Sequence, residues 1–114
     1  MEYRQLIINN ITYNVYDNGV IMSKGKLLKP FINKDGYLRI RLGGRAGKLH
    51  LVHRVIASTF ITNAMSKPTV NHKDGNKVNN HVKNLEWATF GENMAHSYSS
   101  GLRKSYNSLK NRGK

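Results

Sequence analysis

The sequence of 114 residues contains no cysteine and only two prolines. Without cysteine, neither a disulfide nor a thiolate zinc site can brace the chain, so rigidity must come from the packing of apolar side chains. No apolar run approaches the roughly 18 residues that a membrane-spanning helix requires, and the first residues lack the apolar block of a signal peptide. These absences predict a soluble, cytoplasmic protein with one modest core and no membrane contact.

Acidic residues are also scarce: six Asp and Glu stand against 19 Lys and Arg, which gives a formal net charge of +13 at pH 7. Such an excess attracts polyanions, and nucleic acid is the commonest polyanionic partner. A ribosomal-type protein or a merely soluble basic protein has the same composition, so the charge alone leaves these classes open. No basic amphipathic helix is evident, which makes an anionic membrane surface the less favoured partner.

The first half of the chain is rich in β-branched and aromatic residues that are separated by turn residues. Residues 11–16 alternate in polarity, as a half-buried strand does, and an Asp-Asn-Gly turn follows at 17–19. Lysine, glycine and proline between positions 24 and 30 interrupt this pattern. We therefore expect residues 1–50 to form a β-rich region of short antiparallel strands that could serve as a platform for contacting DNA.

A hairpin is predicted at the end of this region. Within residues 37–42, the alternation places Leu38, Ile40 and Leu42 on the core face. A basic, glycine-rich connection then leads back to a strand at 49–51. We expect the hairpin to present four basic side chains on one surface: Arg39, Arg41, Arg45 and Lys48. This surface would face a phosphate backbone, and a merely solvated basic face is the alternative.

Apolar residues at positions 52, 55, 56 and 60 have helical spacing, and we expect this helix to pack behind the hairpin. Arg54 lies on its polar side. His53 lies at its start, where two roles remain open. It either approaches the site described next or is a buried, hydrogen-bonded structural residue.

The segment 70–89 holds the densest set of side chains that could take part in catalysis or metal binding. A strand leads into Asn71 and His72, and a polar loop with an Asp-Gly-Asn turn follows. The chain then returns through Asn84 to an apolar Leu-Glu-Trp strand, in which Glu86 is expected to point outward. This pattern predicts a strand, a long polar loop and a second strand.

A helix is predicted to follow directly. Thr89 and Glu92 have the spacing of a capping box, so the helix should begin at Phe90. Asn93 and His96 are three residues apart and therefore share one face of it. We expect the resulting ββα unit to gather four side chains around one point: Asn71, His72, Asn93 and His96.

The run NHKDGNKVNNHVKNLEW, with VHR upstream and GENMAH downstream, resembles the HNH endonucleases of the intron-homing and phage type. The resemblance covers roughly residues 51–97, and His72, Asn84 and Asn93 match the family's His, Asn, Asn pattern. It implies an α+β fold in which the β-rich N-terminal half packs with a ββα-metal motif at 51–101. The implied activity is a metal-dependent, homing-type hydrolysis of phosphodiester bonds in double-stranded DNA.

The resemblance also implies a role for each residue of the motif. His72 would be the general base, because a neutral imidazole can take a proton from water near pH 7. Asn84 would hold the loop through backbone hydrogen bonds, with an ordinary turn residue as the alternative. Metal ligation would fall to Asn71 and Asn93 through their amide oxygens. His96 is a further candidate ligand, and its alternative is a structural or exposed role.

Oxygen ligands favour Mg²⁺ or Mn²⁺, whereas a ligand such as His96 would shift the preference towards Mn²⁺, Ni²⁺ or Zn²⁺. At Asn71 the sequence departs from many relatives, in which a carboxylate is common. Because neutral ligands attract a cation less strongly, we expect the metal to bind weakly until a DNA phosphate joins the site.

Further DNA contacts are expected from basic residues outside the hairpin: Arg54, Lys73, Lys77, Arg103 and Lys104. The last two lie in a basic tail, residues 102–114, that is expected to be flexible. One site cleaves one strand, so a monomer would nick DNA and a homodimer could cut both strands. Two alternatives remain: a non-catalytic basic module that binds nucleic acid, and a histidine-rich structural metal protein.

Overall fold

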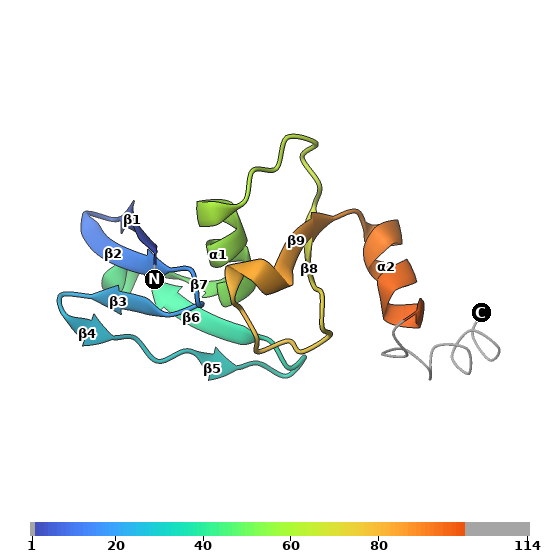
Figure 1. Ribbon diagram of the computed structural model, residues 1–114. Helices are drawn as coiled ribbons and strands as arrows, with labels where there is room; N and C mark the ends of the chain where they lie inside the picture. The colour runs from blue at the N-terminus through green and yellow to red at the C-terminus, as the bar shows by residue number, and fades with distance from the viewer. Residues whose placement is uncertain (1, 100–114) are drawn as a thin grey trace.

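The computed structural model describes residues 2–99 (Figure 1). Its N-terminal part is a four-stranded antiparallel sheet in the order β1-β2-β3-β4. The strands are β1 (Tyr3–Ile8), β2 (Ile11–Tyr16), β3 (Ile21–Ser23) and β4 (Lys26–Leu27). Tyr13 and Val15 of β2 are buried, which confirms the half-buried strand predicted at residues 11–16. Asn9 and Asn10 both have positive φ angles, as the two-residue turn between β1 and β2 requires.

A second antiparallel sheet has the order β5-β6-β7. It comprises β5 (Phe31–Ile32), β6 (Leu38–Leu42) and β7 (Lys48–Leu51), with the short 3₁₀ helix η1 (Gly44–Ala46) between the last two. The predicted hairpin is therefore confirmed, and Ile40 and Leu42 are buried as expected.

The prediction that the four basic residues of the hairpin share one surface is wrong for Lys48. In the observed register Leu42 pairs with Lys48, and Arg41 pairs with Leu49. Directly paired residues point to the same face and successive residues to opposite faces. Lys48 thus lies on the face of Leu42, opposite Arg39 and Arg41, because the conformation of the connecting residues sets the register.

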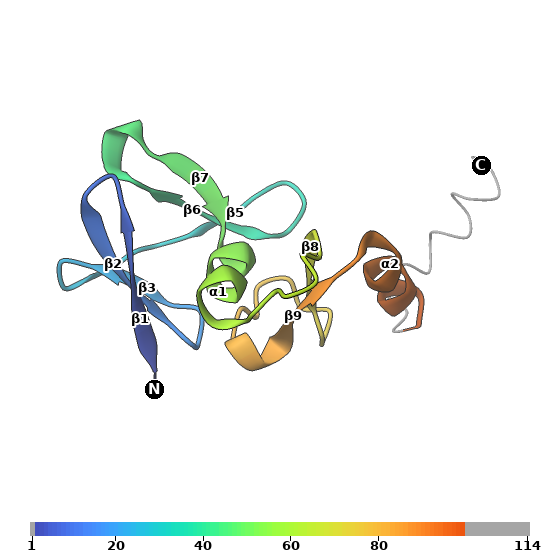
Figure 2. The ribbon, with the colours of Figure 1, turned by 90° about the horizontal axis from the view of Figure 1, so that it is seen from above.

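Helix α1 (Val52–Phe60) confirms the helix that the apolar spacing predicted. Its apolar residues join the core formed by the two sheets, where Val15, Leu42, Val52 and Ile56 are fully buried. Viewed from above, α1 lies between the N-terminal sheets and the C-terminal strand pair (Figure 2). Neither α1 nor the later helix of the described part is long and apolar enough to cross a membrane.

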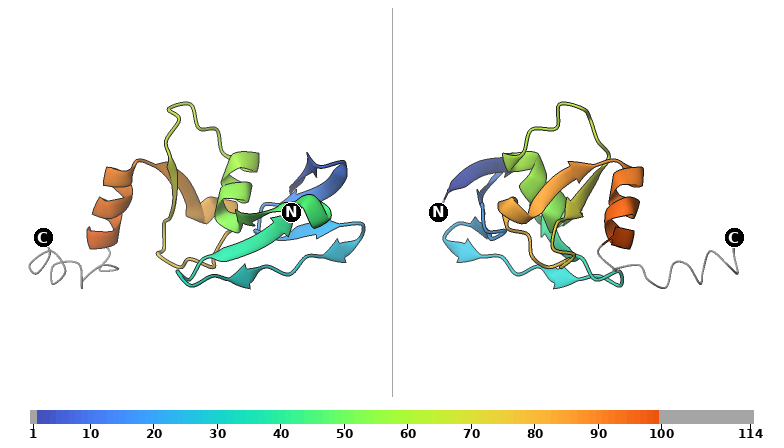
Figure 3. Two further views of the ribbon diagram at one scale, coloured as in Figure 1. Left: turned by 180° about the vertical axis from the view of Figure 1, so that it is seen from behind. Right: turned by 45° about the vertical axis from the view of Figure 1, so that its right-hand side comes forward.

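The C-terminal part is the predicted ββα unit. It consists of β8 (Thr69–His72), the short 3₁₀ helix η2 (Val82–Asn84), β9 (Leu85–Ala88) and α2 (Phe90–Ser99). The capping box is confirmed, since the backbone N–H of Glu92 donates to the Thr89 hydroxyl at 3.0 Å and the Thr89 N–H donates to the Glu92 carboxylate at 2.9 Å. Figure 3 shows that α2 stands at the end of the molecule farthest from the N-terminal sheets.

The indole of Trp87 ties this unit to α1, because its Nε1 donates to the backbone oxygen of Ile61 at 3.0 Å. Leu85, on the same face of β9, belongs to the common core. Side-chain packing and hydrogen bonds thus anchor the strand pair that carries the motif, in a chain without cysteine.

We expect Leu42→Ala to lower the free energy of unfolding by about 2–5 kcal/mol, since the leucine is fully buried and its loss leaves a cavity. The matched control is Leu27→Ala, at a side chain that is 57% exposed, which should change stability far less. Urea denaturation of both variants measures the difference. Equal losses for the two would contradict the core described here.

Candidate active site

Asn71 and His72 are consecutive residues of β8, so their side chains point to opposite faces of the strand pair. The amide nitrogen of Asn71 donates to Oε2 of Glu86 on β9 at 2.8 Å. His72 instead packs against the rings of His53 and Tyr37, at centroid distances of 4.9 and 5.9 Å. The two side chains therefore lie on opposite faces of the strand, which corrects the prediction that they gather around one point with Asn93 and His96.

Among the described residues, one hydrogen bond holds the His72 ring. Its Nε2 lies 2.8 Å from Oδ1 of Asn80, and only 5% of the residue is exposed. With the carboxamide oxygen of Asn80 facing the ring, the matching tautomer carries its proton on Nε2 and its lone pair on Nδ1. Burial lowers the pKa of His72 below its usual value of 6.5, and the hydrogen bond to Asn80 opposes this shift. The imidazole is thus neutral near pH 7 and able to accept a proton.

Asn80 is a site residue that the sequence did not reveal. It is buried, and the turn that contains Asp17 and Gly19 packs against it. Gly19 has a φ of +93°, and a Cβ at this position would lie 3.0 Å from the backbone oxygen of Asn80. The backbone N–H of Val82 also donates to the Asp17 oxygen at 2.7 Å. These contacts join a turn of the first sheet to the loop that orients His72. The two segments lie far apart in the sequence, so no local pattern predicts that they meet.

His53 lies beside His72, edge to face, and is buried. Burial lowers its pKa to about 4, with smaller contributions from the nearby His72 and Arg54. Its Nδ1 has no hydrogen-bond partner within the described range 2–99. Of the two open roles, the structure thus supports the approach to the site rather than a hydrogen-bonded structural histidine.

Asn84 closes the polar loop as predicted. Its Nδ2 donates to Oδ1 of Asp74 and to the backbone oxygen of Asn79, both at 2.9 Å, and its Oδ1 accepts from the Asp74 N–H at 3.0 Å. The Asp74 carboxylate also accepts from Asn79 and from the backbone of Asn76, and these hydrogen bonds lower its pKa. Both oxygens of Asp74 are therefore occupied within the loop.

The opposite face of β8 carries Asn71, one of the predicted metal ligands. Asn71 lines a cavity of about 220 Å³ together with Glu86, Glu92 and Lys67. Helix α2 packs against β8, and Asn93 reaches Thr69 of that strand at 3.4 Å. Thr69 and Asn71 lie two apart in the strand and share this face.

His96 is half-buried on α2, three residues beyond Asn93, so these two candidate ligands share a helix face as predicted. Within residues 2–99 no group of three or more His, Asp or Glu side chains could hold a metal by itself. Any metal on this face must therefore use carboxamide oxygens. Asn71 lies beside the Glu86 carboxylate, and Asn93 contacts Thr69 on the same face of β8. Their carboxamide oxygens are hard donors of the kind that suits Mg²⁺ or Mn²⁺.

Several predicted DNA-contacting residues already make intramolecular contacts. Arg54 donates to the backbone oxygen of Pro68 at 2.8 Å and lies over the Trp87 ring. Arg41 donates to the Gly47 oxygen at 2.8 Å. Lys77 donates to the Asp35 oxygen at 2.9 Å and lies over the Tyr37 ring beside the buried histidines.

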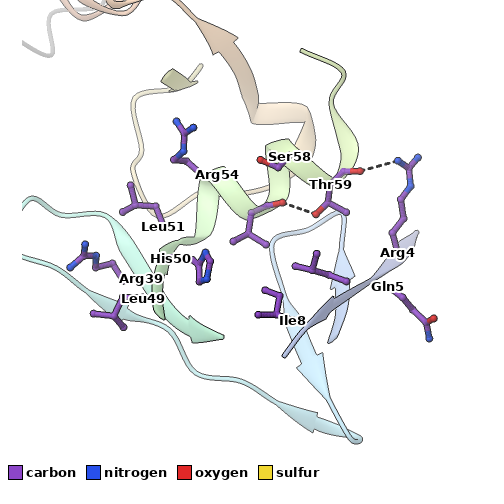
Figure 4. A pocket seen from close by; sticks show the side chains of 12 residues that line it. Arg4, Gln5, Ile8, Arg39, Leu49, His50, Leu51, Arg54, Ser58 and Thr59 are labelled. Carbon is purple, nitrogen blue, oxygen red and sulfur yellow. Dashed lines mark hydrogen bonds between the residues drawn. The ribbon is translucent and has the colours of Figure 1, made fainter. Parts of the chain in front are cut away.

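The remaining basic positions differ in their surroundings. Arg45, Lys48 and Lys73 are exposed, whereas Arg103 and Lys104 lie outside the described residues. A cavity of about 670 Å³ between β1, β7 and α1 is lined by three arginines: Arg4, Arg39 and Arg54. Figure 4 shows Arg39 and Arg54 on one side of this cavity and Arg4 on the other. Arg4 has no basic neighbours in the sequence, so no charge pattern marked it as a candidate DNA contact.

No protein-family model matches the chain. The DNA endonuclease I-HmuI of Bacillus phage SP01 is 41% identical over 105 residues, which cover 89% of this chain and 60% of that protein. An SPbeta prophage-derived putative HNH homing endonuclease of Bacillus subtilis strain 168 is 44% identical over 93 residues, covering 77% and 53%. An uncharacterized HNH endonuclease of Acanthamoeba polyphaga mimivirus is 43% identical over 91 residues, covering 77% and 28%.

A solved structure that describes DNA binding and cleavage by the HNH homing endonuclease I-HmuI matches with a TM-score of 0.75 and 38% identity. The match covers 96% of this chain and 67% of the other, which confirms the predicted α+β fold with a ββα motif. The chain belongs to the HNH endonuclease family. It spans between 28% and 60% of the length of these three curated relatives.

The buried histidine pair predicts a pH-dependent stability. His53 has a pKa of about 4 in the folded protein against 6.5 in the unfolded chain, so the unfolded state binds more protons between these values. The contribution is fully present above pH 6.5 and is lost as the pH falls to 4. We expect a loss of about 3 kcal/mol over this window.

Chemical denaturation from pH 7 to pH 4, with chelator present, measures this loss. In His53→Phe the dependence should become shallower, because one of the two buried imidazoles is gone. An identical slope for the wild type and the variant would show that His53 is not responsible.

Proposed function

We propose that this protein is a metal-dependent, homing-type HNH endonuclease that hydrolyses phosphodiester bonds in double-stranded DNA. The observation that carries the proposal is the hydrogen-bonded, buried His72 on one side of β8, with the candidate ligands Asn71 and Asn93 on the other. The relatives support it, since one is named a DNA endonuclease and another a putative HNH homing endonuclease.

His72 acts as the general base in this proposal. Its Nδ1 accepts a proton from the attacking water, while Asn80 holds the Nε2 side of the ring and fixes its direction. The lowered pKa keeps the ring neutral, and therefore basic, at physiological pH. Asn84 is a positioning residue, because its hydrogen bonds hold the loop that presents Asn80.

A divalent cation would be held by the carboxamide oxygens of Asn71 and Asn93, with His96 as a further candidate. Mg²⁺ or Mn²⁺ suits this oxygen-rich set better than Ni²⁺ or Zn²⁺. When bound, the cation supplies positive charge for the phosphate and for the departing 3′ oxygen. The protein's part is to orient these oxygens on one face of the strand pair and the base on the other.

DNA is attracted by the net charge of +13 and held by exposed basic residues, which include Lys73 in the loop after the general base. In this proposal residues 1–50 contribute backbone contacts from Arg39, Arg41 and Arg45 on the hairpin. Lys48 contributes from its opposite face. A monomer with one such site nicks one strand, and a homodimer would be needed to cut both.

Supercoiled plasmid incubated with Mg²⁺ or Mn²⁺ should be converted to relaxed circles, and EDTA should abolish the conversion. His72→Ala should lower the rate by about 10²–10⁴-fold, the usual contribution of a general base. His81→Ala is the matched control, because it removes another imidazole of the same loop region and should retain cleavage. If wild type and His72→Ala both shift the plasmid's mobility but leave it intact, the non-catalytic binding module is the correct function.

Binding to DNA should depend steeply on salt. About 6–10 phosphate contacts would lose roughly 10³–10⁵ in affinity between 50 and 200 mM salt. Lys73→Gln should lower the slope of log affinity against log salt by about one. The control Lys24→Gln removes the same charge at the β3–β4 turn, far from the ββα unit in Figure 1, and should lower it less. A flat salt profile for the wild type would contradict the electrostatic account.

A further inference from the structure

Glu86 lies directly across the strand pair from Asn71. The two are register partners of β8 and β9, so their side chains share the face that α2 covers. Oε2 of Glu86 accepts the hydrogen bond from the Asn71 amide nitrogen at 2.8 Å. The sequence predicted only that Glu86 points outward, and it is indeed exposed. Its contact with a predicted metal ligand is a consequence of the strand register.

This contact orients the Asn71 carboxamide. Only 5% of Asn71 is exposed, and with its nitrogen bound to Glu86 the oxygen is the free end of the group. No hydrogen bond from another group of the described residues ends on this oxygen. Asn71 and Glu86 both line the 220 Å³ cavity, so a polar oxygen of a buried side chain and a carboxylate meet in one small space.

Glu86 differs from the predicted metal ligands because its side chain carries a negative charge. The ligands predicted from the sequence, Asn71, Asn93 and His96, bring no negative charge to a divalent cation in a protein of net charge +13. Glu92, the other carboxylate of the cavity, is paired with Lys67 at 3.0 Å and caps α2. Within residues 2–99 Glu86 forms no ion pair with a lysine or arginine, so its charge is not neutralised.

We propose that Glu86 is the carboxylate ligand of the divalent cation, and that β9 therefore supplies the negative charge that Asn71 of β8 lacks. One carboxylate oxygen holds the Asn71 amide and the other is available to the cation. A hard cation such as Mg²⁺ or Mn²⁺ takes carboxylate and carboxamide oxygens together. The inference rests on the proposed metal-dependent function and names the residue that gives the site its charge.

Binding of Mn²⁺ alone to the full-length protein, measured by the electron paramagnetic resonance of free Mn²⁺, tests the proposal without cleavage. Glu86→Gln keeps the size and can still accept the hydrogen bond from Asn71, but it removes the charge. We expect it to weaken Mn²⁺ binding by at least about tenfold. The control Glu92→Gln removes one charge from the same cavity and retains a residue that capping boxes accept, so it should change binding much less.

A charge swap provides the sharper comparison. Asn71→Asp combined with Glu86→Gln moves the carboxylate across the strand pair while keeping one amide and one carboxylate in contact. This double variant should recover most of the Mn²⁺ affinity that Glu86→Gln loses. Thermal unfolding with chelator present shows that each variant is folded before its affinity is compared.

The outcomes of these measurements distinguish the role of Glu86 as a ligand from the proposed nuclease function. If the wild type binds Mn²⁺ and Glu86→Gln binds it equally well, Glu86 is not a ligand, while the proposed nuclease function stands. If Glu92→Gln weakens Mn²⁺ binding as much as Glu86→Gln, the loss of affinity reflects the net charge of the cavity and not ligation by Glu86. This result would overturn the inference. A wild-type protein that takes up no Mn²⁺ would overturn the metal site and the role of Glu86 together.

Discussion

The side chains of consecutive strand residues point to opposite faces of a sheet, and in β8 this alternation separates Asn71 from His72. One face meets α2 and carries the oxygen donors, and the other meets α1 and carries the buried imidazoles. A slip of one residue between β8 and β9 would exchange the two faces of the strand. The register of this pair therefore decides which side chains meet α1 and which meet α2.

Burial produces the chemistry of the imidazole face. His53 and His72 are removed from water in a strongly basic protein, so protonation of either ring is disfavoured. Asn80 supplies a hydrogen bond that fixes the direction of the His72 ring. The loop that carries Asn80 is held at two ends, by the network around Asn84 and by the turn at Gly19. The His72 ring is thus positioned by groups from both halves of the chain.

Local patterns predicted the parts of the site that local physics determines. The capping box of α2 and the loop contacts of Asn84 follow from residue types at short spacing, and both are confirmed. The contacts of Asn80, the face of Lys48 and the pairing of Glu86 with Asn71 could not be predicted in the same way. Each depends on strand register or on packing between distant segments, for which a single sequence carries no local signal.

The central claim is that the metal site and the His72 imidazole lie on opposite sides of β8. The position of the cation relative to β8 tests this claim most directly. Crystals of the protein with Mn²⁺ and a DNA duplex would locate the ion by its anomalous scattering. We predict a peak on the α2 side of β8, beside Asn71 and Asn93, with His72 on the far side of the bound phosphate. A peak between His53 and His72, with none beside Asn71, would contradict it.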